Sequence, residues 1–300
     1  MTGAAGDRQD GPMAETYVKT FTDPDEATAE AAGLEWLAEA EDAGGTRIAR
    51  VLAHPEPRVL HLEQISDGAP TPEQAERFGR SLAHTHAAGA PHWGAPSPGF
   101  LQQGSLRMGR SRTAFVSAAD APDTWGAFFA EYRIRDYVSR IVDQGGFDGS
   151  EAAVFERVAG RLEDGEFDSP QPALVGDGPA RLHGDLWAGN VLWPTPGQPV
   201  DGTTPTGAVL IDANPHGGHA ETDLALLGLF GLPRLETVLA AYDEESPLAE
   251  GWQDRVELHQ LAPLLLHVFL FGLLVHRGGA PSSPPLRVTA AVRLMPGSSS

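Results

Sequence analysis

The chain has 300 residues, enough for one large domain or for two smaller lobes with their own cores. Its 21 basic and 41 acidic residues give a formal net charge of −20, so we expect neither nucleic acid nor an anionic membrane as a partner. The absence of cysteine excludes disulfides, a thiolate nucleophile and cysteine-ligated zinc, and the acidic N-terminus lacks the apolar core of a signal peptide, so we expect a cytoplasmic protein.

The first ordered segment is predicted to be a short strand followed by a helix. Tyr17 and Val18 favour a strand that leads into Lys19, the only lysine in a chain with twenty arginines. Asp23 is a typical N-cap, and Pro24 suits the first turn of a helix. Apolar residues at helical spacing give this helix a buried face, which consists of Ala27, Ala31, Leu34 and either Leu37 or Ala38.

Two more strands are predicted before a linker. The first covers residues 47–53, and the second covers residues 58–65, where RVLHLEQI has alternating apolar positions. The sequence SDGAP at 66–70 is rich in turn-forming residues. Because several strands and a single helix come first, residues 1–66 are expected to form a small mixed lobe.

The rest of the chain has mainly helical patterns. Thr71 and Gln74 predict a capping box, and helical patterns continue to about residue 165, interrupted by a Gly/Pro/Ser-rich loop at 89–103. We therefore expect residues 67–277 to form a larger helical lobe.

The apolar segment at 261–275 requires a separate interpretation. It contains fifteen residues, carries Pro263 and His267, and is shorter than the roughly 20 residues needed to span a bilayer. We expect a helix buried in the core. Residues 278–300 contain GGAPSSPP and end in PGSSS, so a poorly ordered tail is predicted there.

The chemistry is expected in residues 181–193, which read RLHGDLWAGNVLW. Within them, HGDLWAGN has the H-x-D-x-x-x-x-N spacing of a kinase catalytic loop. In that arrangement Asp185 would accept a hydroxyl proton and Asn190 would hold a magnesium ion. The apolar segment AVLID ends in Asp212, 27 residues after Asp185, where kinases carry a second metal-binding aspartate.

The single lysine fits the same interpretation. A strand lysine in this architecture contacts the nucleotide phosphates and pairs with a glutamate from the following helix. Glu30 lies beside the apolar face defined by Leu34 and Leu37, whereas Glu35 points elsewhere. We therefore predict that Lys19 pairs with Glu30, a role in which the planar fork of arginine is a poor substitute for a compact ammonium group.

A metal-hydrolase site is the alternative for the same part of the chain. Imidazole and carboxylate groups ligate zinc or iron, and the candidate ligands lack a helical H-x-x-x-H pair. These candidates are His183, His216 and His219 with Asp185 and Asp212.

Three segments resemble the fructosamine kinase (ketosamine kinase) family of the aminoglycoside phosphotransferase and protein-kinase-like fold. They are LEWL at 34–37, LHGDLWAGNVLW at 182–193 and IDANPHGGHAETDLALLGLFG at 211–231. The resemblance extends over about residues 17–277. It implies an α+β, two-lobed fold that uses ATP and Mg²⁺. We expect the chain to be a monomer, although the sequence does not fix the oligomeric state. The implied reaction transfers the γ-phosphoryl group to a sugar hydroxyl of a small-molecule or protein-bound ketosamine, a deglycation repair step.

The resemblance also assigns roles by position. It makes Asp185 the base, Asn190 and Asp212 the metal ligands, and Lys19 with Glu30 the phosphate pair. The segment from Glu63 to Ile65 would be the hinge whose backbone meets adenine. The residues implied at or behind the acceptor are Trp187, the loop from His216 to His219, and the supporting Glu221 and Asp223.

Departures from the family pattern keep two other functions open. Members carry a strand, a Gly-rich turn and a second strand ahead of the lysine, whereas only eighteen residues precede Lys19, and GAAG at 3–6 is a poor substitute. A truncated reading frame or weak nucleotide binding would explain this, and a non-catalytic kinase-like protein is one alternative. The other is a phosphotransferase for aminoglycosides or choline, although Trp187 and the GGH sequence argue against it. Ala213 and Ala220 replace a proline and an arginine of the family pattern, so the acceptor contacts are expected to differ.

Overall fold

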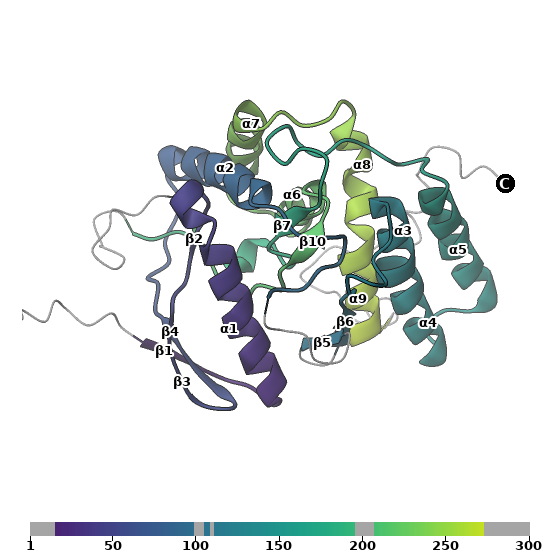
Figure 1. Ribbon diagram of the computed structural model, residues 1–300, viewed down its shortest axis with the longest axis horizontal. Coiled ribbons are helices and arrows are strands. Elements are labelled where there is room, and N and C mark those ends of the chain that lie inside the picture. Colours follow the sequence, from purple (N-terminus) through teal and green to yellow (C-terminus); the bar gives the residue numbers. More distant parts are fainter. Residues whose placement is uncertain (1–15, 99–104, 109–110, 196–206, 273–300) are drawn as a thin grey trace, which may run out of the picture.

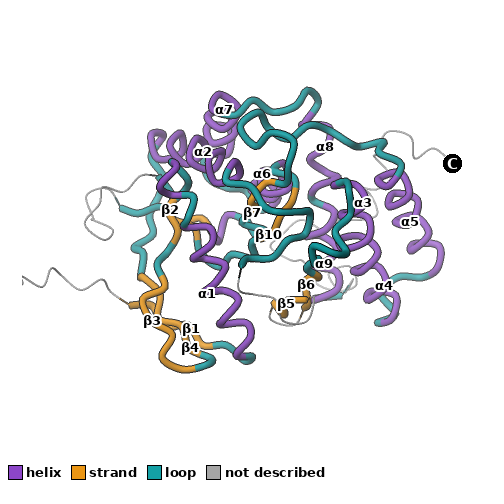
Figure 2. The backbone as a smooth tube through the Cα atoms, in the orientation of Figure 1, coloured by secondary structure: helices purple, strands orange, loops and turns teal. Residues whose placement is uncertain are grey.

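A computed structural model describes residues 16–98, 105–108, 111–195 and 207–272. The sheet of β1, β3 and β4 lies on one side together with α1, and α3, α4, α5, α8 and α9 lie on the other, with β7, β10 and α6 between them (Figure 1). Figure 2 shows that the strands are short and that helices make up most of the second side. The expected tail at 278–300 and the GAAG segment lie outside the described residues.

The elements are joined by tight turns and by longer loops, such as residues 164–179 between the fifth α-helix and the seventh strand. The strands are β1 (Thr16–Thr20), β2 (Arg47–Ile48), β3 (Val51–Glu56), β4 (Val59–Glu63), β5 (Ser105–Met108), β6 (Ser111–Ala114), β7 (Ala180–Leu182), β8 (Val191–Leu192), β9 (Val209–Leu210) and β10 (His216–Gly218). The α-helices are α1 (Pro24–Ala38), α2 (Pro72–Ala87), α3 (Trp125–Phe129), α4 (Asp136–Asp143), α5 (Gly149–Glu163), α6 (Glu221–Leu229), α7 (Leu235–Glu245), α8 (Trp252–His259) and α9 (Leu261–Phe271). The described part of the chain also contains three short helical segments, which are η1 (Glu41–Ala43), η2 (Ala130–Arg135) and η3 (Ala188–Asn190).

The first sheet holds Lys19 next to α1. Strand β4 lies between β1 and β3, and both pairings are antiparallel, with Lys19 opposite Leu60. Helix α1 begins where predicted, because the Asp23 side chain accepts a hydrogen bond from the backbone N–H of Asp25 at 3.0 Å. The expected apolar face of α1 is buried at Leu34 and Leu37, which fixes the helix beside the strand that carries the lysine.

The prediction of one continuous strand at residues 47–53 is wrong. Its first part, β2, pairs in parallel with β9, and its second part, β3, pairs with β4 in the first sheet. The chain changes partner between them, where the backbone N–H of Ala49 donates to the Leu210 carbonyl at 3.0 Å. The prediction of extended backbone was correct, but the local sequence did not reveal which sheet each part joins.

One hydrophobic core runs through both expected lobes. Leu60 and Leu62 of β4 belong to the same buried cluster as Phe78 and Leu82 of α2 and Leu186 of the catalytic loop. The boundary near residue 66 is therefore a change in architecture across a continuous core. A second cluster fills the helical side, where Phe128, Phe129, Ile134, Phe155 and Leu265 are buried.

The helical part agrees with the prediction except at one hairpin. Thr71 and Gln74 form the expected capping box of α2. Strands β5 and β6 form an antiparallel hairpin inside the region predicted to be helical after the 89–103 loop. Helix α3 continues through η2, a π-helical turn, into α4.

The apolar segment after residue 260 forms α9, as predicted. Leu261, Leu264, Leu265 and Val268 of this helix are buried against the helical side of the molecule. None of the helices within the described residues is long and apolar enough to cross a membrane.

Candidate active site

The catalytic loop between β7 and β8 is held by hydrogen bonds to its own backbone. The backbone N–H of Asp185 donates to His183 Nδ1 at 3.3 Å, so the ring carries its proton on Nε2, which lies 2.9 Å from the Ile211 carbonyl. Burial lowers the pKa of His183 and keeps the ring neutral. Gly184 has φ of 80°, and a Cβ there would come within 2.0 Å of the Asn214 carbonyl oxygen, so this turn requires glycine.

The carboxylate of Asp223 holds the backbone at the start of this loop in place. Its carboxylate accepts hydrogen bonds from the backbone N–H groups of His183 at 2.7 Å and of Gly184 at 3.0 Å. His86 Nε2 lies 3.3 Å from the same carboxylate, and the Tyr242 hydroxyl lies 2.8 Å from His86 Nδ1. Burial acts to raise the pKa of Asp223, but His86 and the amide of His183 outweigh it, so the net pKa is lowered and the carboxylate stays charged.

Asp185 and Asn190 lie side by side at the top of this loop. The Asn190 amide nitrogen donates to the Asp185 carbonyl at 2.8 Å and to the Asp185 carboxylate at 3.2 Å. Burial raises the pKa of Asp185 to about 6, against the lowering effect of the Asn190 hydrogen bond. A carboxylate with this pKa is ionised at neutral pH yet basic enough to take a hydroxyl proton.

The side chain of Lys19, on β1, forms ion pairs with Glu30 and with Asp212, the aspartate predicted to be the second metal ligand. Its Nζ lies 2.8 Å and 2.6 Å from the two carboxylate oxygens of Glu30, and 2.8 Å from Asp212 Oδ1. Burial acts to lower the pKa of Lys19, but the two carboxylates outweigh it, so the net pKa is raised. The ion pair predicted from helical spacing is therefore present, with Asp212 as an additional partner.

Asp212 adopts an unusual backbone conformation. Its φ is 54°, in the left-handed region, which a non-glycine residue occupies at a cost of about 1 kcal/mol. The strain is offset by the loops around it, because the backbone N–H of Ile211 donates to the Asn190 carbonyl at 3.2 Å. Backbone strain of this kind concentrates at functional sites, and here it turns a half-exposed carboxylate toward Lys19.

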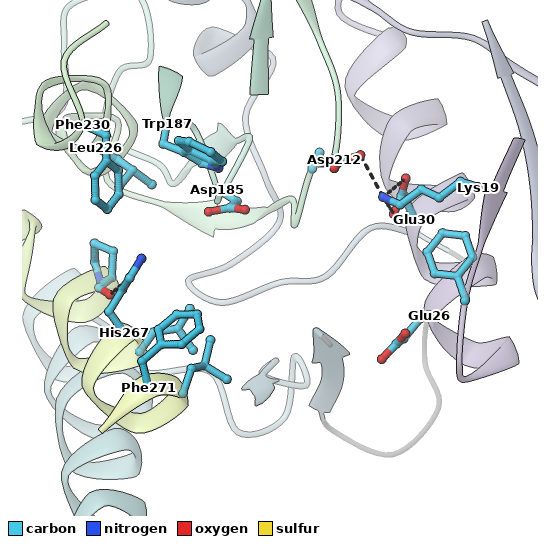
Figure 3. A pocket seen from close by; sticks show the side chains of 15 residues that line it. Lys19, Glu26, Glu30, Asp185, Trp187, Asp212, Leu226, Phe230, His267 and Phe271 are labelled. Carbon is cyan, nitrogen blue, oxygen red and sulfur yellow. Dashed lines mark hydrogen bonds and ion pairs between the residues drawn. The ribbon is translucent and has the colours of Figure 1, made fainter. Parts of the chain in front are cut away.

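These groups line one pocket of about 550 Å³ (Figure 3). Lys19, Glu30 and Asp212 lie at one end, and Trp187 lies at the other, with Asp185 between them. The remaining lining residues are Phe21, Glu26, Ala213, Leu226, Phe230, Pro263, Leu266, His267, Leu270 and Phe271. A concave, mostly apolar pocket with a few convergent charged groups is typical of a small-molecule site.

The residues expected near the acceptor take different positions. Trp187 lines the pocket and is 38% exposed, with its indole against Gly189, where a Cβ would come within 2.3 Å of the ring. His216 is buried in a small hollow of about 60 Å³ on the other side of Asp185, and His219 lies in a separate hollow beside Trp125. Neither histidine is among the residues that line the main pocket.

Glu221 and Asp223 have separate structural roles. Glu221 accepts two hydrogen bonds from Arg255, at 2.8 and 2.6 Å, and is buried. The prediction that Asp223 supports the 216–219 loop needs revision, since its carboxylate holds the amides of His183 and Gly184 instead. The backbone N–H of Glu221 donates to His219 Nδ1 at 3.3 Å, so Glu221 stays in contact with that loop.

The histidines of the predicted metal-hydrolase alternative, His183, His216 and His219, do not form one group with Asp185 and Asp212. His183 bonds the Ile211 carbonyl, and His216 Nδ1 lies 3.0 Å from the Asn214 carbonyl. Within the described residues, the group with metal-like spacing is instead His219, Glu221 and His259. Arg255 already binds both carboxylate oxygens of Glu221, so a second cation does not suit this buried group.

The side chains of the predicted hinge are not part of the pocket lining. Glu63 ends β4, and its side chain is buried in an ion pair with Arg47 at 2.7 Å. Its backbone N–H donates to the Arg50 carbonyl at 2.9 Å. Ile65 follows in the connection to α2, and neither residue is among those lining the pocket of Lys19.

Sequence reasoning missed two sets of site residues. His86 and Tyr242 support Asp223 from helices far away in the sequence, and His86 had no derivable role without them. Phe230, His267 and Phe271 line the pocket from α9 and the end of α6. The pattern of α9 predicted a core helix, and no local signal distinguished the side chains that face the pocket.

Comparisons with known proteins find similar sequences over most of the chain. The family model described as fructosamine kinase matches residues 15–277. A probable ketoamine kinase of Synechocystis sp. is 31% identical over 252 residues, which is 81% of this chain and 72% of the relative. A probable ketoamine kinase of Enterococcus faecium is 30% identical over 192 residues, which is 64% of this chain and 60% of the relative.

Solved structures extend the comparison to the fold. The crystal structure of a "putative fructosamine-3-kinase" from Thermobifida fusca is 37% identical and has a TM-score of 0.74, covering 93% of this chain and 85% of that one. Choline kinase LicA from Streptococcus pneumoniae is 15% identical with a TM-score of 0.53, covering 94% of this chain and 86% of that one. The second likeness concerns the fold alone, which is the expected α+β, kinase-like fold.

Proposed function

The chain belongs to the fructosamine kinase family, and we propose that it phosphorylates fructosamines or ribulosamines, free or protein-bound, as a deglycation repair step. The family makes it a phosphotransferase that acts on a sugar hydroxyl. One observation carries the proposal for this chain. Lys19 Nζ bridges Glu30 and Asp212 in the same pocket that holds Asp185, so a phosphate-binding cation and a candidate base share one cavity.

Lys19 is proposed to contact the phosphates of ATP. The ammonium lies within 2.8 Å of three carboxylate oxygens, a geometry that needs a compact charge with several donors. Glu30 holds the lysine from α1, which places the charge at the end of the pocket opposite Trp187. We also propose that the backbone of residues 63–65 meets the adenine and that residues 1–66 and 67–277 act as nucleotide and acceptor lobes of a monomer.

The residues next to Lys19 fit a magnesium ion. Asp212 offers a half-exposed carboxylate, and the Asn190 amide nitrogen already donates to Asp185, which leaves the amide oxygen as a donor for a metal. Hard oxygen donors of this kind suit Mg²⁺. When bound, the ion would neutralise charge on the phosphates of ATP.

Asp185 is proposed to act as the base. At neutral pH its carboxylate is ionised, because its pKa is about 6. It would accept the proton of the acceptor hydroxyl while the hydroxyl oxygen bonds to the γ-phosphorus and the bond from that phosphorus to the β-phosphate oxygen breaks. The hydrogen bond from Asn190 orients the carboxylate, so most of the catalysis would come from positioning.

Release of ADP in the presence of defined acceptors tests this function. The purified chain is given Mg²⁺ and ATP with a fructosamine, a ribulosamine, choline or an aminoglycoside, beside the Asp185→Asn variant. Release that depends on a ketosamine and is lost in the variant supports the proposal. Release with choline or an aminoglycoside alone would indicate another small-molecule kinase. Absence of both release and ATP binding would indicate a non-catalytic protein.

A further inference from the structure

Four aromatic rings form a continuous row along the acceptor end of the pocket. The ring centroids of Trp187 and Phe230 are 5.8 Å apart, those of Phe230 and His267 are 5.3 Å apart, and those of His267 and Phe271 are 5.8 Å apart. Trp187 comes from the catalytic loop, Phe230 caps the C-terminal end of α6, and the other two lie on α9. We call these four side chains the ring wall (Figure 3).

The ring wall is open to solvent. Trp187 is 38% exposed, Phe230 is 42% exposed and Phe271 is 64% exposed, and all of them line the 550 Å³ pocket. Large apolar side chains that stay exposed together at one pocket indicate a surface that a ligand covers. Rings of this kind favour a flat or extended apolar group, because aromatic contacts are geometrically specific.

The position of the ring wall identifies which substrate it faces. Lys19 and Asp212, the groups suited to phosphates and metal, lie at the opposite end, and Asp185 lies between the two ends. Trp187 is only two residues from Asp185, so the ring wall begins where the acceptor hydroxyl must approach. The ring wall is therefore on the side of the acceptor and away from the nucleotide.

The charges around the pocket favour a cationic acceptor. Of the carboxylates that line it, Glu30 and Asp212 are paired with Lys19 at the opposite end, whereas Asp185 lies between that end and the ring wall. A ketosamine carries a secondary amine that is protonated at neutral pH, so the negative charge of Asp185 favours its entry. An acceptor without a basic nitrogen would lack this attraction.

His267 adds a polar group to the apolar ring wall. Its Nδ1 lies 2.9 Å from the Pro263 carbonyl oxygen, which can only accept, so Nδ1 carries a proton. In the neutral ring, Nε2 is then an acceptor, and Figure 3 shows this side chain pointing from α9 into the pocket. A hydroxyl or ammonium group of the acceptor can donate to it.

We propose that the ring wall binds the nitrogen substituent of the ketosamine and selects substrates in which that substituent is aromatic or otherwise apolar. This inference rests on the proposed function, because it names the acceptor class of the same pocket. Phe230 and Phe271 contribute the apolar surface, Trp187 joins that surface to the catalytic loop, and His267 accepts a hydrogen bond from the sugar or the amine.

Two acceptors that share a sugar and differ only at nitrogen test the selection by turnover. We compare kcat/KM for N-benzyl and N-methyl fructosamine in the wild type, Phe230→Ala, Phe230→Tyr and Leu174→Ala, the last being an exposed apolar residue outside the pocket. The wild type is expected to prefer the benzyl compound by about tenfold, as two aromatic contacts allow. Phe230→Ala removes most of this preference, whereas Phe230→Tyr and Leu174→Ala retain it. Equal values in the wild type, or an unchanged preference in Phe230→Ala, would overturn the inference.

Binding without turnover separates this inference from the proposed function. Calorimetric titration of Asp185→Asn with the two compounds measures affinity when no phosphoryl transfer occurs. The inference is supported if Asp185→Asn binds the benzyl compound more tightly than the methyl compound and if adding Phe230→Ala weakens the binding of the benzyl compound. This support holds even if the wild type phosphorylates no ketosamine. Equal or undetectable binding of both compounds would contradict it, even if turnover is observed.

Discussion

Replacing Asp185 with asparagine is predicted to abolish activity and at the same time to stabilise the fold. Burial raises the pKa of this carboxyl from 3.8 to about 6, which means that the folded protein holds an unfavourable charge at neutral pH. Each pKa unit corresponds to 1.36 kcal/mol, so the shift is equivalent to roughly 3 kcal/mol above pH 6. An asparagine has no charge to bury and can still accept the hydrogen bond from Asn190.

The sharper test is how the difference in stability between Asp185→Asn and the wild type changes with pH. Between pH 6 and 3.8 the folded wild type takes up a proton that the unfolded chain does not yet bind, so its stability rises relative to the variant as the pH falls. The variant should be more stable by about 1 to 3 kcal/mol at pH 8, and the two proteins should be equal below about pH 4. Groups that titrate in both proteins cancel in this difference.

Denaturant unfolding of the wild type and Asp185→Asn at pH 8 and pH 4 measures this difference. Asp164→Asn serves as the matched control, because Asp164 is an exposed carboxylate at the C-terminal end of α5, and removing its charge should stabilise the fold by less than about 1 kcal/mol through the helix dipole alone. A variant that is less stable than the wild type at pH 8, or a difference that is the same at both pH values, would refute the reasoning. If Asp185→Asn only lost activity, a structural defect could explain the loss. If it lost activity and gained stability, a structural defect would be ruled out.

Three further predictions follow from the site. Because Asp185 must be ionised to act as a base, kcat/KM should fall about tenfold per pH unit below its pKa of about 6, and a flat profile from pH 5 to 8 would contradict that role. Lys19→Arg should lower kcat/KM by at least about 100-fold with little change in melting temperature, since a planar guanidinium cannot match the contacts to Glu30 and Asp212, and near-normal activity would contradict the phosphate role. Asp223→Ala should cost roughly 3 to 5 kcal/mol in denaturant unfolding, because the amides of His183 and Gly184 lose a buried charged partner, and a cost below about 1 kcal/mol would argue against the supporting role.

The parts of the site formed by residues close to one another in the sequence were the most predictable. Asp185 and Asn190 belong to one short motif, and Glu30 followed from the spacing of α1, since helical geometry fixes which side chains share a face. The fold class was predictable for the same reason, because a strand lysine, a catalytic loop and a strand-end aspartate occur in that order in kinases. Each of these signals is local or depends on order along the chain.

Features that depend on long-range packing were not predictable. The strand expected at 47–53 divides between two sheets because β9, some 160 residues away, pairs with its first part. His219 and Glu221 share a motif with Asp223, yet α6 turns them toward Trp125 and Arg255 while Asp223 faces the catalytic loop. The pattern of α9 indicated burial and did not identify the rings of His267 and Phe271 as pocket residues, because a helix that is apolar all round does not reveal which side chains meet a pocket.

The most direct test of the central claim is to identify the product. A fructosamine is incubated with ATP, Mg²⁺ and either the wild type or Asp185→Asn, and the acceptor is examined by mass spectrometry and phosphorus NMR. We predict that the wild type yields a fructosamine carrying one phosphoryl group on a sugar hydroxyl and that the variant, although folded, yields none. Unmodified fructosamine with the wild type under conditions where ATP binds, or equal phosphorylation by both proteins, would contradict the account.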